Sequence, residues 1–532
     1  MKRLLCAVMA LAMMLGTALA EGAAPEAAVT GVSFAEGWDV RDQNIVFYEI
    51  FVGSFSDSDG DGVGDLRGII NRMDYLNDGD PQSGLSLGVE GLWLTPIFRS
   101  PSYHKYDVTD YYAVDPQFGT EADLRELIAL CHERGVRLIL DLPINHTGNQ
   151  NRWYKNFTNA HLMHNPGNDY YDFYTWQTAG DTLPRGRHFA RTGTGDLLVE
   201  ANFADNMPEM NFDSEFVRRT LLDVALHYLR LGVDGFRFDA AKYIYLGDNA
   251  ACVDFWTWYL GELRAEFPDM IAIAEVWDSD RITDRYAAVM NCFNFTTSQA
   301  SGLIAETAKA GDANRWTAYL QSRADALAAI SPDAHNVPFI ANHDTDRAAG
   351  FLTVASGQMQ MAANLYLLSP GSPFIYYGEE IGLRGSRGGA NTDANRRLAM
   401  LWGDGDRVAD PAGADYDASR QTPYSVADLL GNPNGILAYY KKLLMVRRAN
   451  PEIARGAFTA LSFPGVKVGG FVSTWNGRSA AVLHNPTQRT IRVDLAEATD
   501  LVFTEISAVL GKGAELEGTV LTLEGQTSAV LR

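Results

Sequence analysis

Four acidic residues stand where short apolar, β-rich segments of this chain end. They are Asp141, Asp239, Glu275 and Asp344, and Arg237 stands two positions before Asp239. A structural ion pair would explain one such acid. Four of them on one rim would be costly to fold, because each charge must be paired or solvated. We therefore treat this set as a candidate catalytic centre.

Two carboxyl groups arranged in this way meet the needs of glycosidic-bond cleavage with retention of configuration. One acts as the nucleophile, and a second, ~5–5.5 Å away, first donates and then removes a proton. Neighbouring strands lie ~4.8 Å apart, which suits Asp239 and Glu275 at the ends of adjacent strands. Arg237 shares a strand face with Asp239, and its charge favours the ionised nucleophile. Glu275 must start protonated, which requires a dry environment such as Trp277 could help to supply. Asp344 would then accept hydrogen bonds from ring hydroxyls as positive charge develops.

These residues need a scaffold that brings strand ends together, and the sequence pattern indicates one. Short apolar segments alternate with helical patterns, as in the βαβ units of a parallel sheet. The predicted strands are 45–50, 89–94, 136–141, 233–239, 271–276, 292–295, 337–342 and 373–377. The predicted helices include 121–133, 215–231, 252–267, 359–368 and 436–448. Eight strands favour a (β/α)8 barrel, in which functional residues lie at the C-terminal ends of the strands. A doubly wound sheet is disfavoured, because no glycine-rich turn follows the first strand.

Two stretches fall outside the barrel pattern. The long segment after the third strand is rich in Asn, Gly, Tyr and Trp, and an insertion of this length at the active-site face is usually functional. After the last predicted helix, short strands follow one another, which predicts a β-sandwich. We expect a signal peptide (1–20), a linker (21–37), the first part of the barrel (38–146), an inserted domain (147–213), the rest of the barrel (214–452) and a C-terminal β-sandwich (453–532).

The N-terminus and the overall charge bear on where the protein acts and on what it binds. Lys2 and Arg3 precede an apolar run, and Ala18-Leu19-Ala20 has the small-x-small pattern of a cleavage site. We therefore expect export to an extracellular or periplasmic location. Removal of Lys2 and Arg3 changes the net charge from −22 to −24. Such a charge disfavours nucleic acids and anionic membranes as partners and favours a neutral substrate. We expect a monomer.

The blocks that hold the candidate residues resemble the signature regions of the α-amylase family of glycoside hydrolases. They read Asp141-Leu-Pro-Ile-Asn145-His146, Gly235-Phe-Arg237-Phe-Asp239, Glu275-Val-Trp277 and Asn342-His343-Asp344. The resemblance covers nearly all of the chain after the signal peptide. It implies that Asp239 is the nucleophile, Glu275 the acid/base and Asp344 the transition-state stabiliser. It also implies substrate contacts for Tyr106, Asp107, His146, Arg237, Ala240, Lys242 and His343, with Tyr106 stacking on the sugar in subsite −1.

An acidic, glycine-rich loop follows the first predicted strand. It reads Asp57-Ser-Asp59-Gly-Asp61-Gly-Val63-Gly-Asp65. Alternating acids and glycines bend a loop around a hard cation, but an EF-hand would need Glu at position twelve, where Gly68 stands. The loop resembles the calcium loop of the oligo-1,6-glucosidase-like and neopullulanase-like branches. This implies a structural Ca²⁺ with ligands from Asp57, Asp59, Asp61, Asp65 and the carbonyl of Val63. A second calcium, held in part by Asn145, is left open.

Three further features bear on which linkage is cut. Met207-Pro-Glu-Met-Asn211 resembles, with two departures, a motif of branches between oligo-1,6-glucosidases and neopullulanases. By the same resemblance, a small residue such as Ala240 after the nucleophile accompanies α-1,4 cleavage. Tyr243 follows Lys242 where many α-amylases have His, which leaves the +2 contact open.

We expect a secreted α-amylase that hydrolyses α-1,4 bonds in starch and maltooligosaccharides. A neopullulanase-like enzyme, an α-glucosidase and a transglycosylase are alternatives within the family. A non-catalytic glucan-binding homologue is an alternative of another class. It is disfavoured because Asp239, Glu275 and Asp344 are all present.

Overall fold

The computed structural model describes residue 32 and residues 44–387 and 393–532. The predicted signal peptide and nearly all of the predicted linker lie outside these residues. Among the helices described, none is long and apolar enough to cross a membrane.

The centre of the molecule is a closed barrel of parallel strands. One sheet contains β1 (Phe47–Ile50), β2 (Gly91–Leu94), β5 (Arg137–Leu142), β9 (Gly235–Phe238), β10 (Ile271–Ala274), β11 (Asn291–Cys292) and β12 (Phe374–Tyr376), in the order β11-β10-β9-β5-β2-β1-β12. Parallel bridges from Phe293 to Val337 and from Phe339 to Phe374 place the segment 337–339 between β11 and β12. This segment occupies the position of the eighth strand in the ring, so the predicted (β/α)8 barrel is confirmed.

Helices surround the barrel, and local sequence signals set their ends. They include α1 (Leu66–Asn71), α3 (Glu121–Glu133), α5 (Glu215–Leu231), α6 (Asn249–Glu266), α8 (Leu303–Ala310), α9 (Ala313–Ile330), α10 (Gln358–Leu367) and α12 (Ile436–Ala449). The hydroxyl of Ser214 caps α5 by accepting a hydrogen bond from the N–H of Val217, and Gly232 ends the helix in the left-handed conformation. A capping box at Thr120 and Asp123 begins α3. Both helices have the predicted bounds.

The inside of the barrel is packed rather than hollow. Large apolar side chains from successive strands fill it, among them Phe47, Trp93, Ile139, Ile273 and Phe374. A Cβ atom on Gly91 would lie 2.4 Å from the ring of Phe47, so glycine at this position leaves room for that ring. Side chains alternate between the two faces of a strand, so the next inward-facing residue lies two positions further along. The polar inward-facing residues come at this next position, toward the C-terminal ends of the strands.

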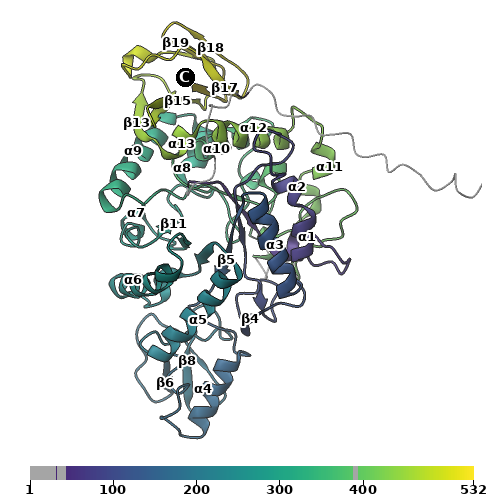
Figure 1. Cartoon of the computed structure of the whole chain (residues 1–532), viewed down its shortest axis with the longest axis vertical. Coiled ribbons are helices and arrows are strands. Elements are labelled where there is room, and N and C mark those ends of the chain that lie inside the picture. The colour runs from purple at the N-terminus through teal and green to yellow at the C-terminus, as the bar shows by residue number, and fades with distance from the viewer. Residues whose placement is uncertain (1–31, 33–43, 388–392) are drawn as a thin grey trace, which may run out of the picture.

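The segment after β5 forms a separate small unit. It contains α4 (Arg152–Leu162) and an antiparallel sheet in the order β6 (Trp176–Thr178), β8 (Leu197–Glu200), β7 (Phe189–Arg191). Figure 1 shows this unit at one end of the long axis of the molecule. Its aromatic residues pack against each other, as Phe157, Phe173 and Tyr174 do.

The C-terminal part consists of two antiparallel sheets. One contains β13 (Ala457–Ser462), β14 (Gly469–Trp475), β15 (Arg478–Asn485), β20 (Thr527–Leu531) and β17 (Ile506–Leu510), in that order. The other contains β16 (Ile491–Asp494), β19 (Val520–Leu523) and β18 (Ala514–Glu517). Side chains from both sheets, such as Leu483 and Leu521, share one core, so the predicted β-sandwich is confirmed. It lies at the opposite end of the molecule from the inserted unit (Figure 1).

Candidate active site

A cleft of about 780 Å³ opens at the C-terminal ends of the barrel strands. Asp239 and Ala240, which follow β9, and Glu275, which follows β10, lie on its surface. Phe203 and Met207 reach it from the inserted unit. The remaining lining comes from loops around the mouth: Ser102, Tyr103, His104, Tyr106, His146, Ala204, Tyr243, Trp277, Asp344, Arg387, Asp393, Arg396 and Arg397. Six of the predicted site residues are therefore brought together on one surface.

A single buried guanidinium group joins three of the predicted acids. Nη1 of Arg237 donates hydrogen bonds to Oδ1 of Asp141, at 2.8 Å, and to Oδ1 of Asp239, at 2.6 Å. Nη2 lies 3.0 Å from Oε2 of Glu275, in an ion pair that lacks the alignment of a hydrogen bond. Arg237 has no exposed surface, so this charge is fixed beneath the cleft. Because both carboxyl groups contact the same guanidinium, Asp239 and Glu275 lie close together, as a retaining mechanism requires.

Burial changes how readily both carboxyl groups ionise. Burial raises the pKa of Glu275 to about 7, although Arg237 opposes this shift. Burial also raises the pKa of Asp239, to about 6, again against the influence of Arg237. The sequence predicts that Arg237 keeps Asp239 ionised, whereas the net shift is upward because burial outweighs the guanidinium. A raised pKa keeps Glu275 protonated closer to neutral pH, as the role of an acid requires.

The residue after Asp239 adopts an unusual backbone conformation. Ala240 has a φ of 48° and a ψ of 38°, in the left-handed region that residues other than glycine rarely occupy. In this conformation its N–H donates a hydrogen bond of 2.9 Å to Oε2 of Glu275. The turn therefore ties the position of Asp239 to that of Glu275.

Asp344 is held by two positively charged neighbours. Nε2 of His343 lies 3.0 Å from one of its oxygens, and Nη2 of Arg397 lies 2.8 Å from the other. Burial alone would raise the pKa of Asp344, but these charges outweigh burial and keep the pKa well below its usual range. Asp344 is therefore ionised at neutral pH and can accept hydrogen bonds.

Tyr106 and His146 border the same space. The hydroxyl of Tyr106 donates a 2.9 Å hydrogen bond to Oδ2 of Asp141, and its ring stacks on that of His343 with centroids 5.6 Å apart. Burial lowers the pKa of His146 to about 4, so its ring is neutral at physiological pH. The ring of Phe203 packs against His146, at 5.2 Å between centroids.

Two exposed aromatic side chains stand at the mouth. Phe203 is 45% exposed and packs against Tyr243, with ring centroids 4.9 Å apart. Trp277 is 40% exposed and lies flat on Phe295 at 4.7 Å. Aromatic faces exposed in a cleft suit the flat CH faces of sugars.

Two predicted substrate contacts lie away from the cleft surface. Asp107 is buried and accepts hydrogen bonds from the hydroxyls of Ser100 and Ser102. Nζ of Lys242 donates to the carbonyl oxygen of Trp277, at 2.7 Å, and pairs with Asp278. The structure therefore places both residues where they fix surrounding loops. Arg237 and His343 also lie beneath the cleft surface, but they contact the acids that line it.

The acidic loop that follows β1 has the geometry of a cation site. Carboxylate oxygens of Asp57, Asp59 and Asp61 lie within 4.8 Å of one another. The N–H groups of the loop donate to these same carboxylates, for example Gly62 to Asp57 at 2.9 Å. Asp65 differs, because its two oxygens accept hydrogen bonds from Ser58 and from the N–H of Gly68 at the start of α1.

The backbone around Gly68 excludes an EF-hand. A Cβ atom there would lie 2.0 Å from the carbonyl oxygen of Ser56, so no glutamate fits. Within the part of the chain that the structure describes, Asp57, Asp59 and Asp61 are the one cluster of three or more metal-ligating side chains.

Two residues of the centre were not among the predicted site residues. Arg397 follows a short 3-10 turn (Ala394–Arg396) far from any strand end, and no periodic pattern marks it. Glu49 lies on β1 and accepts a hydrogen bond from Nδ1 of His343 at 2.5 Å. As an acid inside an otherwise apolar predicted strand, Glu49 could have been found from the sequence.

Comparisons with known proteins agree with this geometry. Residues 49–456 match the family model for the α-amylase catalytic domain. Alpha-amylase 3 of Dictyoglomus thermophilum is 35% identical over 419 residues, covering 76% of this chain and 77% of the relative. The 4-alpha-glucanotransferase of Thermotoga neapolitana is 32% identical and covers 66% and 74%. The solved structure of Eubacterium rectale Amy13B superposes with a TM-score of 0.84 at 31% identity, covering 92% of this chain and 96% of that one. With its barrel, its acids at the strand ends and these similarities, the chain belongs to the α-amylase family.

Proposed function

We propose that this chain is an exported, retaining α-amylase that hydrolyses α-1,4-glucosidic bonds in starch and maltooligosaccharides. The observation that carries the proposal is the contact of one guanidinium, that of Arg237, with both Asp239 and Glu275 at the floor of an open cleft. The raised pKa of Glu275 supports its role as the acid, and the hydrogen bond from Arg237 to Asp239 supports the role of Asp239 as the nucleophile.

In the first half-reaction, a carboxylate oxygen of Asp239 attacks the anomeric carbon. The bond to the leaving sugar breaks as Glu275 transfers its proton to the glycosidic oxygen, and a glycosyl ester with Asp239 forms. Asp344 accepts hydrogen bonds from ring hydroxyls and stabilises the oxocarbenium-like transition state. Arg237 remains charged throughout and opposes protonation of Asp239.

In the second half-reaction, Glu275 acts as a base. It removes a proton from water, whose oxygen attacks the anomeric carbon and releases Asp239. The sugar leaves with its original anomeric configuration, and both carboxyl groups return to their starting states. The N–H of Ala240, which donates to Oε2 of Glu275, keeps this carboxyl group aimed at the bond through both steps.

The shape of the cleft supports an oligosaccharide as the substrate. A volume of about 780 Å³ is larger than one sugar needs, and it lies within the range of ligand pockets in general. Phe203 and Trp277 offer exposed aromatic faces beyond the acids. A neutral glucan also suits an acidic protein, which carries a net charge of −22.

A second candidate activity is transglycosylation, in which a sugar hydroxyl takes the place of water. The same two aromatic faces could hold an acceptor sugar, and one relative reported above is named a 4-alpha-glucanotransferase. Neopullulanase-like and α-glucosidase activities use the same acids and differ in the bond that is presented to them. A non-catalytic glucan-binding protein would not need a carboxyl group with the raised pKa of Glu275 beside Asp239.

We further propose that the loop 57–65 binds one Ca²⁺ with a structural role. Three carboxylates that converge within 4.8 Å suit a hard cation with oxygen ligands. The residues that would hold the ion are Asp57, Asp59 and Asp61. Asp65, by capping α1, would couple the loop to the barrel. The N-terminal sequence pattern supports export, and nothing in the proposed chemistry needs a partner subunit.

A product time course separates these activities. The protein should convert soluble starch to maltose and short maltodextrins, and it should cleave pullulan and isomaltose far more slowly. Chains longer than the starting maltooligosaccharide would instead identify a glucanotransferase. Preferential cleavage of isomaltose would contradict α-1,4 specificity, and the absence of turnover on all three substrates would contradict an enzymatic function.

A further inference from the structure

Glu49 is a buried acid that the mechanism above does not use. It lies on β1, is 1% exposed, and does not line the cleft. The barrel register places it beside Trp93 on β2 and Tyr376 on β12. Along β1 it shares a face with Phe47, whose ring lies inside the barrel, so Glu49 also points inward. A buried carboxylate needs a charged or hydrogen-bonding partner, and this partner is His343.

Glu49 holds His343 through two contacts. Its Oε1 accepts a hydrogen bond from Nδ1 of the ring at 2.5 Å, and the backbone N–H of His343 lies 3.3 Å from the same oxygen. Neither side chain is exposed by more than 2%. The distance and the burial are those of a charge-assisted hydrogen bond, with the imidazole N–H as the donor.

The other ring nitrogen of His343 faces the candidate active site. Nε2 lies 2.7 Å from the hydroxyl oxygen of Tyr106 and 3.0 Å from Oδ2 of Asp344. The Tyr106 hydroxyl donates its proton to Asp141, so its oxygen can accept one from Nε2. Both neighbours of Nε2 are therefore acceptors, and Nε2 must carry a proton as well.

We propose that Glu49 is a positioning residue for the sugar-cleaving reaction, because it keeps His343 doubly protonated. The imidazolium then donates from Nε2 toward Asp344 and Tyr106 and holds both in place under the sugar. This inference rests on the proposed function, since it assigns Glu49 a part in the same site. A neutral His343 would still bond to one neighbour, but it would remove a positive charge from beside Asp344.

Charged groups from every element around His343 act on it. Glu49 faces it from β1, Asp141 from β5, and Asp344 follows it in sequence. Tyr106 packs on its ring, and Arg397 donates from Nε to its carbonyl oxygen at 3.1 Å. Burial alone would lower the pKa of His343, but Asp344 and Glu49 outweigh burial and raise it to about 10. The imidazolium therefore persists from acidic pH up to that value and is lost above it.

The test is the pH profile of kcat/KM on α-maltosyl fluoride for wild type and Glu49→Gln. Fluoride leaves without needing a proton, so deprotonation of Glu275 does not impose the alkaline limb that it would impose with a glucan substrate. Glutamine keeps the shape and the hydrogen bond but removes the charge. The alkaline limb of the variant should lie at least one pH unit below that of wild type. At a pH above both limbs, kcat/KM of the variant, relative to its own maximum, should then be about tenfold lower than that of wild type.

Glu379→Gln is the matched control, because this glutamate is also buried but bonds to Tyr366 and Tyr440 away from the cleft. Its profile should follow wild type. In a His343→Gln background, adding Glu49→Gln should shift the limb no further. A Glu49→Gln profile that is scaled down equally at every pH, or that superimposes on wild type, overturns the inference. If wild type fails to turn over the fluoride at all, the proposed function fails instead.

Discussion

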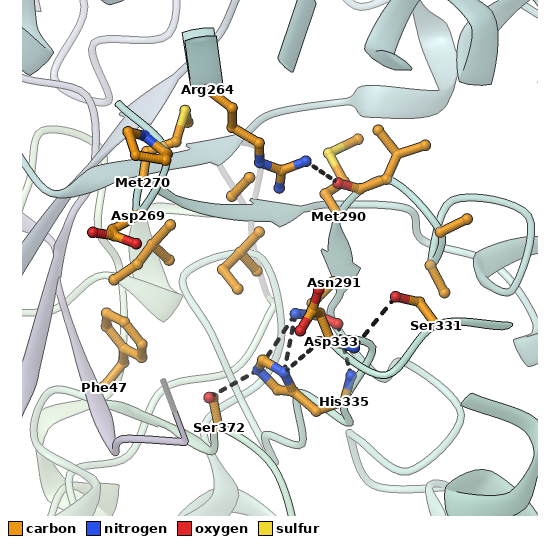
Figure 2. A pocket seen from close by; sticks show the side chains of 17 residues that line it. Phe47, Arg264, Asp269, Met270, Met290, Asn291, Ser331, Asp333, His335 and Ser372 are labelled. Carbon is orange, nitrogen blue, oxygen red and sulfur yellow. Dashed lines mark hydrogen bonds between the residues drawn. The ribbon is translucent and has the colours of Figure 1, made fainter. Parts of the chain in front are cut away.

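The barrel has a cavity at each of its two ends, and the two differ in how their polar groups are used. The cavity at the N-terminal ends of the strands, of about 300 Å³, is lined by residues such as Phe47, Arg264, Asn291, His335 and Ser372 (Figure 2). There several of the polar groups bond to one another or to the backbone. Arg264 donates to the carbonyl of Val289 at 2.8 Å, and His335 contacts both Asn291 and Ser372.

At the C-terminal end, the polar groups are held in place, and part of their hydrogen-bonding capacity is directed toward the cleft. Asp239, Glu275 and Asp344 are held in place by Arg237, His343 and Arg397. Their pKa values are driven in different directions, upward for Glu275 and downward for Asp344. The comparison shows that a cavity alone does not mark a site. What marks it is a set of charges whose protonation states the fold keeps different.

The largest predicted effect is that of Glu275→Gln at the C-terminal end. General acid–base catalysis is worth ~10²–10⁴-fold, so turnover of starch should fall by that factor, while turnover of α-maltosyl fluoride should fall much less. The raised pKa of Glu275 means that its ionisation opposes folding increasingly as pH rises from its unfolded value to about 7. At pH 8 the variant should therefore melt no lower than wild type.

Initial rates on starch and on the fluoride, together with melting curves at pH 5 and pH 8, check this prediction. A variant that keeps more than about a tenth of the wild-type rate on starch would remove Glu275 from the role of acid. The comparison between the two ends of the barrel would then lose its main support.

An intermediate effect is predicted for the calcium loop. Asp59→Ala should lower the melting temperature in the presence of calcium, by about 1 °C for each kcal/mol of binding free energy that is lost in a chain of this length. Chelation of calcium should have the same effect on wild type, and kcat at low temperature should be nearly unchanged, because the loop does not line the cleft. Asp169→Ala, at an exposed aspartate of the inserted unit, is the control. A melting temperature that is indifferent to both the chelator and Asp59→Ala would contradict the metal site.

The smallest effect is predicted at the N-terminal end of the barrel. Arg264→Met removes one hydrogen bond to a carbonyl, which is worth about 1 kcal/mol of folding free energy. The melting temperature should fall slightly, and kcat/KM on maltooligosaccharides should match wild type. A large loss of kcat/KM without a loss of stability would show that this cavity contributes to function, and the contrast between the two ends would fail.

The acids of the site could be predicted from the sequence because each one ends a strand, and strand ends meet at one rim of a barrel. Arg397 could not, since it reaches Asp344 from a turn that has no repeating pattern. The sequence also assigns substrate contacts to Asp107 and Lys242. Both make local hydrogen bonds to neighbouring loops and lie away from the cleft surface, and their substrate contacts stay predictions. Sequence position alone does not tell which way such side chains point.

The backbone at Ala240 shows a further limit of the sequence. Its neighbour Asp239 identifies the position, but nothing in the sequence reveals the left-handed conformation. A valine there would be strained whatever the substrate, because β-branched residues strongly disfavour this conformation. A change of specificity in Ala240→Val would therefore reflect backbone strain together with the size of the side chain, and it would be a poor measure of the subsite alone.

The central claim is that Asp239 and Glu275 act as the nucleophile and acid/base of a retaining reaction. The most direct test is proton NMR of the first products released from a maltooligosaccharide, recorded before mutarotation. We predict that the new reducing end appears as the α-anomer and drifts to the equilibrium mixture afterwards. A first product in the β form would mean inversion, and it would contradict the role of Asp239 as a nucleophile.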